Sequence, residues 1–155
     1  MLTINQIAAK LNRESSEALI RNIEAMPADK AEWKALELGR SALSQVQECA
    51  VIAAMFADTF SNHAMPAMED DAFSKSMSEL DTVAKAVAAL RANTESLVKA
   101  IEAFPADSLE KTVQLPWEQT PKSFAEVMFT NYWNSTYHEG QISFIQTLYG
   151  DKGYH

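Results

Sequence analysis

The chain of 155 residues has little of several features that mark specialised classes of protein. It holds one cysteine, which excludes an internal disulfide framework and a cysteine-rich zinc site. It also holds only four glycines, and its abundant alanine favours helix. Basic residues are scarce: 13 lysines and arginines stand against 21 acidic residues, a formal net charge of −8. Because no basic cluster is present, we expect binding neither to nucleic acid nor to an anionic membrane surface.

Long apolar runs are missing as well. The longest, CAVIAAMFA, has nine residues and is too short to cross a bilayer as a helix. The N-terminal segment MLTINQIAAK lacks the basic-then-apolar order of a signal peptide. Together these features favour a cytoplasmic protein. The length suits one domain, residues 1–155, in which roughly 70% of the surface of the unfolded chain becomes buried.

The dominant pattern in the sequence is helical, and no strand is expected. Thr3 is a good N-cap for the first helix, and Pro27 follows its end. Thr120 and Pro121 are the expected cap and first residue of the last helix, which Gly150 ends. The apolar spacing predicts four long helices, over about residues 3–26, 41–62, 76–104 and 120–149.

A short repeat suggests how these helices are arranged. The segments IEAMPAD (23–29) and IEAFPAD (101–107) differ at one position and start 78 residues apart. Each one ends a long helix and begins a connector. The repeat therefore predicts two similar helical hairpins, packed around a pseudo-twofold axis and joined by a crossover connection. Two hairpins joined in this way form an all-α four-helix bundle.

The last helix carries polar side chains on the face that its apolar residues assign to the core. At 100° per residue, Asn131, Asn134, His138 and Gln141 share an arc of about 120° with apolar residues such as Ile142. The second helix shows the same feature, with Gln45 in the middle of its apolar stripe and Glu48 at the flank. Because buried polar groups need partners, this pattern predicts a polar cluster between the two helices.

The segment NSTYHEGQISFIQTLYGD resembles the closing helix of the DinB/YfiT-like four-helix bundles, which usually ends in His-x3-His-x-Gly-Gln-Ile/Leu. ALSQVQECA and EWKALELGRSAL resemble the second helix of that family and the segment before it. The resemblance implies the bundle fold and a site where three histidines hold a divalent metal such as zinc or nickel. The matching positions here are Gln45, Asn134 and His138. Two imidazoles are thus replaced, so the implied triad is degenerate and weak metal binding is expected.

Three interpretations of the cluster follow from these residues. One is a small-molecule pocket without metal, lined by Gln45, Glu48, Asn131, Asn134, His138 and Gln141. In this pocket His138 is the candidate acid or base. The second is a hydrogen-bonded network in a non-catalytic dimeric protein of structural or interaction function. The third is a metal-dependent enzyme with an altered ligand set, in which Glu48 joins Gln45 and His138.

Several neighbouring residues carry secondary expectations. Cys49 is expected to be an inert packing residue, and Gly140 to allow close approach of a neighbouring element. Trp117 is a candidate for lining the mouth of the pocket. A second stripe on the last helix holds four aromatic residues: Phe129, Trp133, Tyr137 and Phe144. It indicates either contacts with both neighbouring helices or the interface of a homodimer, of which we favour the homodimer.

Overall fold

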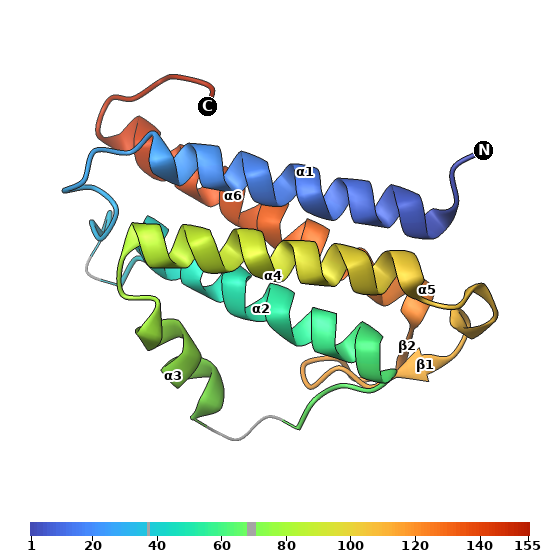
Figure 1. Ribbon diagram of the computed structural model, residues 1–155. Helices are drawn as coiled ribbons and strands as arrows, with labels where there is room; N and C mark the ends of the chain where they lie inside the picture. The colour runs from blue at the N-terminus through green and yellow to red at the C-terminus, as the bar shows by residue number, and fades with distance from the viewer. Residues whose placement is uncertain (37, 68–70) are drawn as a thin grey trace.

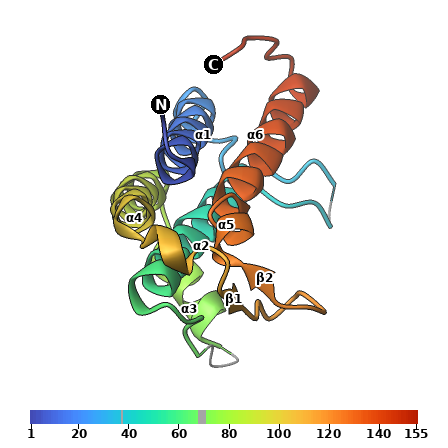
Figure 2. The same ribbon diagram turned by 90° about the vertical axis from the view of Figure 1, so that its right-hand side faces the viewer.

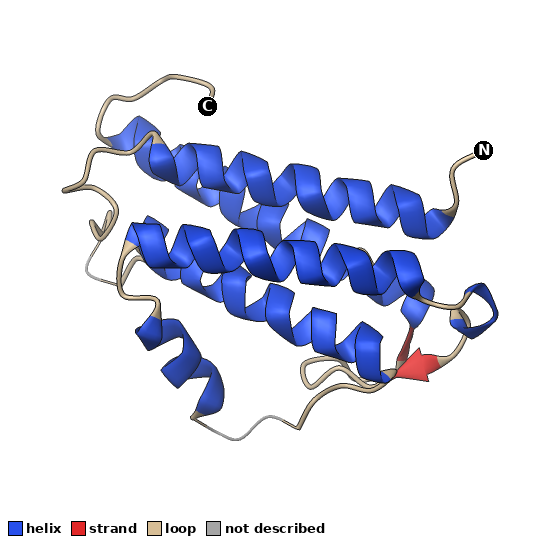
Figure 3. Cartoon of the chain, viewed as in Figure 1, coloured by secondary structure: helices blue, strands red, loops and turns tan. Residues whose placement is uncertain are grey.

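The computed structural model describes residues 1–36, 38–67 and 71–155. Most of these residues lie in four long helices: α1 (Ile4–Glu24), α2 (Ala42–Asn62), α4 (Val83–Ala103) and α6 (Thr130–Leu148). Shorter elements connect them: α3 (Ala72–Glu79), the 3-10 helix η1 (Ala106–Ser108), the strands β1 (Thr112–Val113) and β2 (Lys122–Ser123), and α5 (Phe124–Val127) (Figure 3). The expected all-α four-helix bundle is confirmed.

The first two helices begin where their capping residues predict. The Thr3 side chain accepts a hydrogen bond from the Gln6 backbone, and the Gln6 side chain bonds back to the Thr3 backbone, which completes a capping box. Ser41 caps α2 by accepting from the Ser44 backbone. Both helices end within two residues of the predicted ends. No helix in the described parts of the chain is long and apolar enough to cross a membrane.

The third predicted helix, 76–104, is interrupted. Its first residues belong to α3, and α4 starts at Val83 after an extended Thr82 whose side chain accepts from the Lys85 backbone. A threonine that caps a new helix in this way competes with continuation of the old one. The apolar spacing passes through the break because Leu80 and Val83 both pack against the same core cluster.

The fourth predicted helix, 120–149, is interrupted in its first ten residues, of which only α5 (Phe124–Val127) is helical. Lys122 and Ser123 form β2, which pairs antiparallel with β1 in the register Thr112↔Ser123. Ser123 then caps α5 through a capping box with Glu126, and α6 begins only at Thr130. Pro121 therefore precedes a strand instead of opening a helix. The serine and glutamate three residues apart are the sequence signal for this later start.

The two helices of each predicted hairpin lie across the bundle from one another. Around the bundle the order is α1, α4, α2 and α6, so that α1 packs on α4 and α6, and α2 packs on the same two helices (Figures 1 and 2). Neighbours α2 and α4 run in the same direction, as do α1 and α6 (Figure 1). The two predicted hairpins are thus diagonal pairs, because the long connectors after α1 and α4 span the bundle. Of the four neighbouring pairs, α2 and α6 pack least closely.

The 78-residue repeat extends well beyond the seven residues noted in the sequence. Arg13 pairs with Glu95 at 2.6 Å, and Arg91 pairs with Glu17 at 3.3 Å. Adding 78 to 13 and 17 gives 91 and 95, so each ion pair is the symmetric copy of the other. Between them, Thr94 Oγ1 donates to Ser16 Oγ at 3.0 Å, again 78 residues apart. Equivalent residues that touch each other must lie close to the axis relating them, so α1 and α4 cross at a pseudo-twofold axis.

The core consists of two apolar clusters with a polar middle. One cluster is rich in phenylalanine and includes Phe56, Phe60 and Phe124. The other is aliphatic and includes Leu19 and Ile142. On three of the long helices the buried residues between the two clusters are polar. They are Asn12, Ser15 and Ser16 on α1, Thr94 on α4, and Asn131, Asn134, Ser135 and His138 on α6. The candidate site lies in this polar layer.

Candidate functional site

His138 is the centre of a hydrogen-bonded cluster between α2 and α6. Its Nδ1 lies 3.0 Å from Gln45 Oε1 and 2.9 Å from Gln141 Oε1, while its Nε2 lies 2.9 Å from Glu48 Oε1. Gln141 in turn donates from Nε2 to Tyr137 Oη at 2.9 Å, which directs its carbonyl oxygen towards the ring. Oxygen atoms therefore face both ring nitrogens, and His138 is 1% exposed. Four of the six predicted site residues are brought together here.

Glu48 joins this cluster to a cation that the sequence reading did not assign. Its second carboxylate oxygen lies 2.6 Å from the Arg40 guanidinium, and its side chain is 20% exposed. The hydrogen bond with His138 lowers the pKa of Glu48, and the positive charge of Arg40 lowers it further, whereas burial opposes both effects. Glu48 is consequently a carboxylate at neutral pH. Arg40 precedes the α2 cap, so only its place in EWKALELGRSAL pointed to it.

Two of the predicted site residues lie outside the cluster. Asn134 donates from Nδ2 to Cys49 Sγ at 3.5 Å and has no recorded bond to His138. Asn131 donates to Asn12 Oδ1 at 3.0 Å, and Asn12 bonds to the Met128 carbonyl, so this network ties α1 to the start of α6. Helical spacing placed all these residues on one face, but one face is long enough to serve two networks. Asn131 therefore belongs to the packing of α1 on α6.

Cys49 and Gly140 illustrate one expectation met and one overturned. The Cys49 side chain is fully buried in the aliphatic cluster, and burial raises the pKa of its thiol far above the ordinary value. It is an inert packing residue, as expected. A Cβ built on Gly140 would meet no atom within 4 Å, so the prediction of close packing there is wrong. Gly140 instead lines an open cavity beside Arg40 and Gln141.

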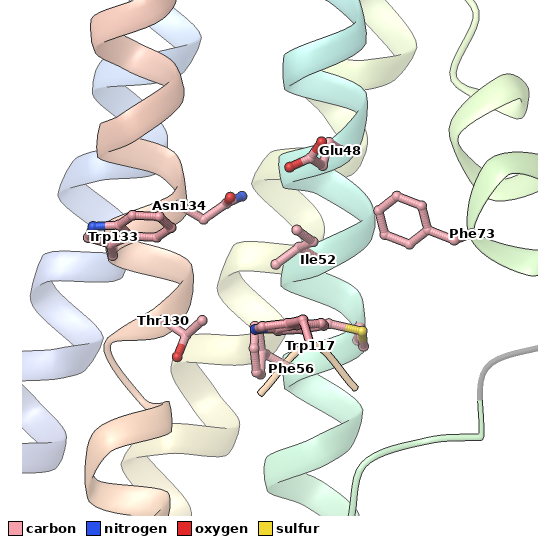
Figure 4. A pocket seen from close by; sticks show the side chains of 9 residues that line it. Glu48, Ile52, Phe56, Phe73, Trp117, Thr130, Trp133 and Asn134 are labelled. Atoms are coloured by element: carbon pink, nitrogen blue, oxygen red, sulfur yellow. The ribbon is translucent and has the colours of Figure 1, made fainter. Parts of the chain in front are cut away.

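A second feature of the site is a cavity of about 370 Å³ between α2 and α6. We call it the aromatic cavity, because rings from four different segments form its walls (Figure 4). Glu48 and Asn134 lie at the same end of it, on facing helices, and Trp117 closes the other end. Its lining residues are Glu48, Ile52, Met55, Phe56, Phe73, Trp117, Thr130, Trp133 and Asn134. His138 is not among them, although it contacts Glu48, which is.

The aromatic cavity explains why sequence reasoning found only part of the site. Phe73 belongs to α3 and Trp117 to the connector after β1, and neither segment carries a periodic signal that would place it beside α2. Trp117 lines the cavity and packs edge-on against Phe56, with ring centroids 6.3 Å apart. Trp133 is the member of the aromatic stripe that faces this opening.

The residues at the family's metal position do not fit zinc or nickel. His138 supplies the only imidazole of the described cluster, and its two nitrogens are both engaged by oxygen atoms of neighbouring side chains. Glu48, the one carboxylate, is already paired with Arg40. No group of three or more His, Cys, Asp or Glu side chains with the geometry of a metal site occurs in the described residues. The Arg40 guanidinium thus pairs with Glu48, the carboxylate that an altered metal site would need as a ligand.

The aromatic stripe on α6 is divided between core and solvent. Phe129 packs against the phenylalanine-rich cluster. Trp133, Tyr137 and Phe144 are 64%, 51% and 63% exposed. Trp133 and Tyr137 stack face to face, with ring centroids 5.6 Å apart. Contact with neighbouring helices therefore accounts for Phe129 but not for the other three.

Comparison with known proteins finds relatives by structure alone. No family model matches the chain, and no curated protein matches it by sequence. Among solved structures, YfiT from Bacillus subtilis, described as a probable metal-dependent hydrolase with an unusual four-helix bundle topology, has a TM-score of 0.79 at 13% identity. That match covers 97% of this chain and 91% of YfiT.

The mycothiol-dependent maleylpyruvate isomerase is similar as well, with a TM-score of 0.75 at 11% identity. A variant of the same isomerase gives the same values. The match covers 92% of this chain but 63% of the isomerase, so the chain spans less than two thirds of that protein. This chain thus has the four-helix-bundle fold of YfiT and of the maleylpyruvate isomerase, the fold that its resemblance to the DinB/YfiT-like bundles implies.

Proposed function

We propose that this protein binds a small organic molecule in the aromatic cavity, without a metal ion. The observation that carries the proposal is the cavity itself, about 370 Å³ of apolar space with Glu48 and Asn134 together at one end. Ligand sites typically combine an apolar lining with a few polar groups that orient the ligand. The cavity also lies between α2 and α6, the pair of helices on which the family places its site.

The role of the polar cluster is then to hold Glu48 in place. His138 and Arg40 each bind one carboxylate oxygen, which fixes the side chain at the end of the cavity. His138 does not line the cavity, so it reaches a ligand only through Glu48. This arrangement supports binding more directly than acid–base catalysis by His138. The metal- and thiol-dependent activities of the structural relatives are not part of the proposal.

A neutral fluorescent probe, N-phenyl-1-naphthylamine, tests for the cavity. We expect it to bind the native protein with one-to-one stoichiometry. Thr130→Trp fills the cavity and is expected to weaken binding at least tenfold. Thr136→Trp is the matched control, because Thr136 lies on the same helix but is exposed and bonds only to the Tyr132 carbonyl. Equal binding by the two variants, or no stoichiometric binding by the native protein, would refute the proposal.

The metal-dependent alternative has its own test. Protein purified without a metal-affinity column is expected to contain zinc and nickel well below one equivalent. Added Zn²⁺ or Ni²⁺ is expected to leave the melting temperature unchanged. A metal that bound the folded state would raise the melting temperature, because it would stabilise that state. One equivalent of bound metal that is lost in His138→Ala would favour the metalloenzyme instead.

A second candidate function is self-association through α6. The observation that favours it is the exposed aromatic group of Trp133, Tyr137 and Phe144, since tryptophan, tyrosine and phenylalanine are enriched at interfaces. Sedimentation equilibrium would then show a dimer, which Phe144→Glu converts to a monomer. A native protein that stays monomeric at the highest concentration reached would rule this out.

A further inference from the structure

The walls of the aromatic cavity carry charge of one sign. Glu48 is its only charged lining residue among those the structure describes. A second hollow, of about 450 Å³, shares Trp117, Thr130 and Trp133 with the cavity. Its charged lining residues are Glu118 and Glu126. The two hollows therefore meet at these three residues, and each charged residue that lines either of them in the described parts of the chain is a carboxylate.

The positive groups of this region lie away from the cavity wall. Arg40 and His138 contact Glu48, yet Arg40 lines the separate cavity beside Gly140 and His138 is buried. Lys122 reaches Glu118 at 4.0 Å but does not line either hollow. A carboxylate offers about four acceptor positions, so Glu48 retains acceptor capacity beside its two recorded partners. Asn134 uses its amide nitrogen towards Cys49, which leaves its carbonyl oxygen as a further acceptor.

The aromatic lining adds a second preference for positive charge. Phe56, Phe73, Trp117 and Trp133 come from α2, α3, the connector after β1, and α6. Trp117 and Trp133 are 52% and 64% exposed, so much of each indole is open to solvent and to a ligand. The face of an aromatic ring attracts cations, most strongly in tryptophan, and several rings around one space are the usual way to bind alkylammonium groups.

We propose that the ligand of the aromatic cavity is a small organic cation, in which an apolar body carries an ammonium or guanidinium group. This inference rests on the proposed function and specifies its ligand class. The positive group lies at the end formed by Glu48 and Asn134, and the body lies between the rings of Trp117 and Trp133. The acidic residues of the second hollow, Glu118 and Glu126, favour the approach of a positively charged ligand.

Three probes of nearly equal size test the charge preference. They are 3-phenylpropylammonium, 3-phenylpropan-1-ol and 3-phenylpropanoate, each measured by displacement of N-phenyl-1-naphthylamine. We expect the ammonium compound to bind about tenfold more tightly than the alcohol, which corresponds to 1.4 kcal/mol. The carboxylate compound is expected to bind more weakly than the alcohol.

Variants separate the cavity from the general negative charge of the protein. Glu48→Gln is expected to remove most of the preference for the ammonium compound and to leave binding of the alcohol unchanged. Glu139→Gln removes the same charge from a residue that does not line the cavity, and is expected to keep the preference. Trp117→Leu is expected to weaken binding of the ammonium compound more than binding of the alcohol. This variant leaves Glu48, His138 and Arg40 unchanged, so its result does not depend on the stability of their cluster.

The outcomes distinguish this inference from the proposed function. If all three probes bind alike, or if Glu139→Gln lowers the preference as much as Glu48→Gln does, the cation inference is refuted and the cavity stands. If none of the probes displaces the dye and the dye itself does not bind, the proposed function fails. A preference for the carboxylate compound would reverse the assignment of charge.

Discussion

The contribution of Glu48 to stability gives the sharpest test of the polar cluster. Glu48→Gln keeps an oxygen that can face His138 but removes the negative charge. A hydrogen bond to a charged group contributes about 1.5–3 kcal/mol against about 1 kcal/mol for a neutral one, so the His138 contact loses about 1 kcal/mol. The Arg40 pair, in which the arginine side chain is 43% exposed, adds at most about 1 kcal/mol. We therefore expect a loss of about 1–2 kcal/mol at pH 7.

The pH dependence of this loss provides an independent check. The hydrogen bond with His138, the main cause, lowers the pKa of Glu48 in the folded protein below its ordinary value of 4.5. An acid with a lowered folded pKa stabilises the protein fully above its unfolded pKa, and this stabilisation disappears as the pH falls through the folded pKa. The free energy of unfolding of the native protein should thus exceed that of Glu48→Gln by a constant amount near neutral pH. The difference should shrink below pH 4.5.

The measurement is urea unfolding at a series of pH values, followed by far-ultraviolet circular dichroism. Glu139→Gln is the control, because it removes one carboxylate next to His138 in the sequence but from a residue that does not line the aromatic cavity. Equal midpoints for the two variants at pH 7 would refute the role given to Glu48. A difference that stays constant or grows as the pH falls to 3 would refute the cause given for its pKa.

Three further predictions concern residues away from Glu48. Gly140→Ala should raise the free energy of unfolding by about 0.5–1 kcal/mol in the same urea assay, because the site is helical and the new methyl group meets no atom. Thr94→Val should lower it by about 1–3 kcal/mol, since Ser16 Oγ then loses its buried donor at the pseudo-twofold axis, and an unchanged midpoint would argue against that bond. The thiol of Cys49 should react with a disulfide reagent only after unfolding, and fast reaction of the native protein would show that the aliphatic cluster opens locally.

The sequence contained enough to predict the bundle because periodicity and caps act locally. Thr3 and Ser41 mark their helices through bonds to residues three positions away. The two errors in helix bounds also have local causes, a second cap at Thr82 and a second capping box at Ser123. The spacing of apolar residues alone cannot decide which of two adjacent caps begins a helix when the apolar face continues through both.

The site was less predictable because it depends on contacts between distant segments. Helical spacing correctly brought Gln45, Glu48, His138 and Gln141 together, since all four face the gap between two neighbouring helices. Asn131 and Asn134 share that face but lie nearer the start of α6, where other partners are nearer. Arg40, Phe73 and Trp117 lie in or after connectors, whose paths are set by tertiary packing. No pattern in the sequence encodes those paths.

The diagonal placement of α1 and α2, and of α4 and α6, has a consequence for how two copies of the chain can meet. The first half of the chain contains α1 and α2, and the second half contains α4 and α6. Neither half covers its own apolar surface, because α1 and α2 each pack mainly on α4 and α6. The second half of another copy offers the same surfaces as the second half of the same chain. Two chains can therefore exchange their second halves through the connection between α2 and α4 and rebuild two complete bundles. Shortening that connection would favour such a domain-swapped dimer over the monomer.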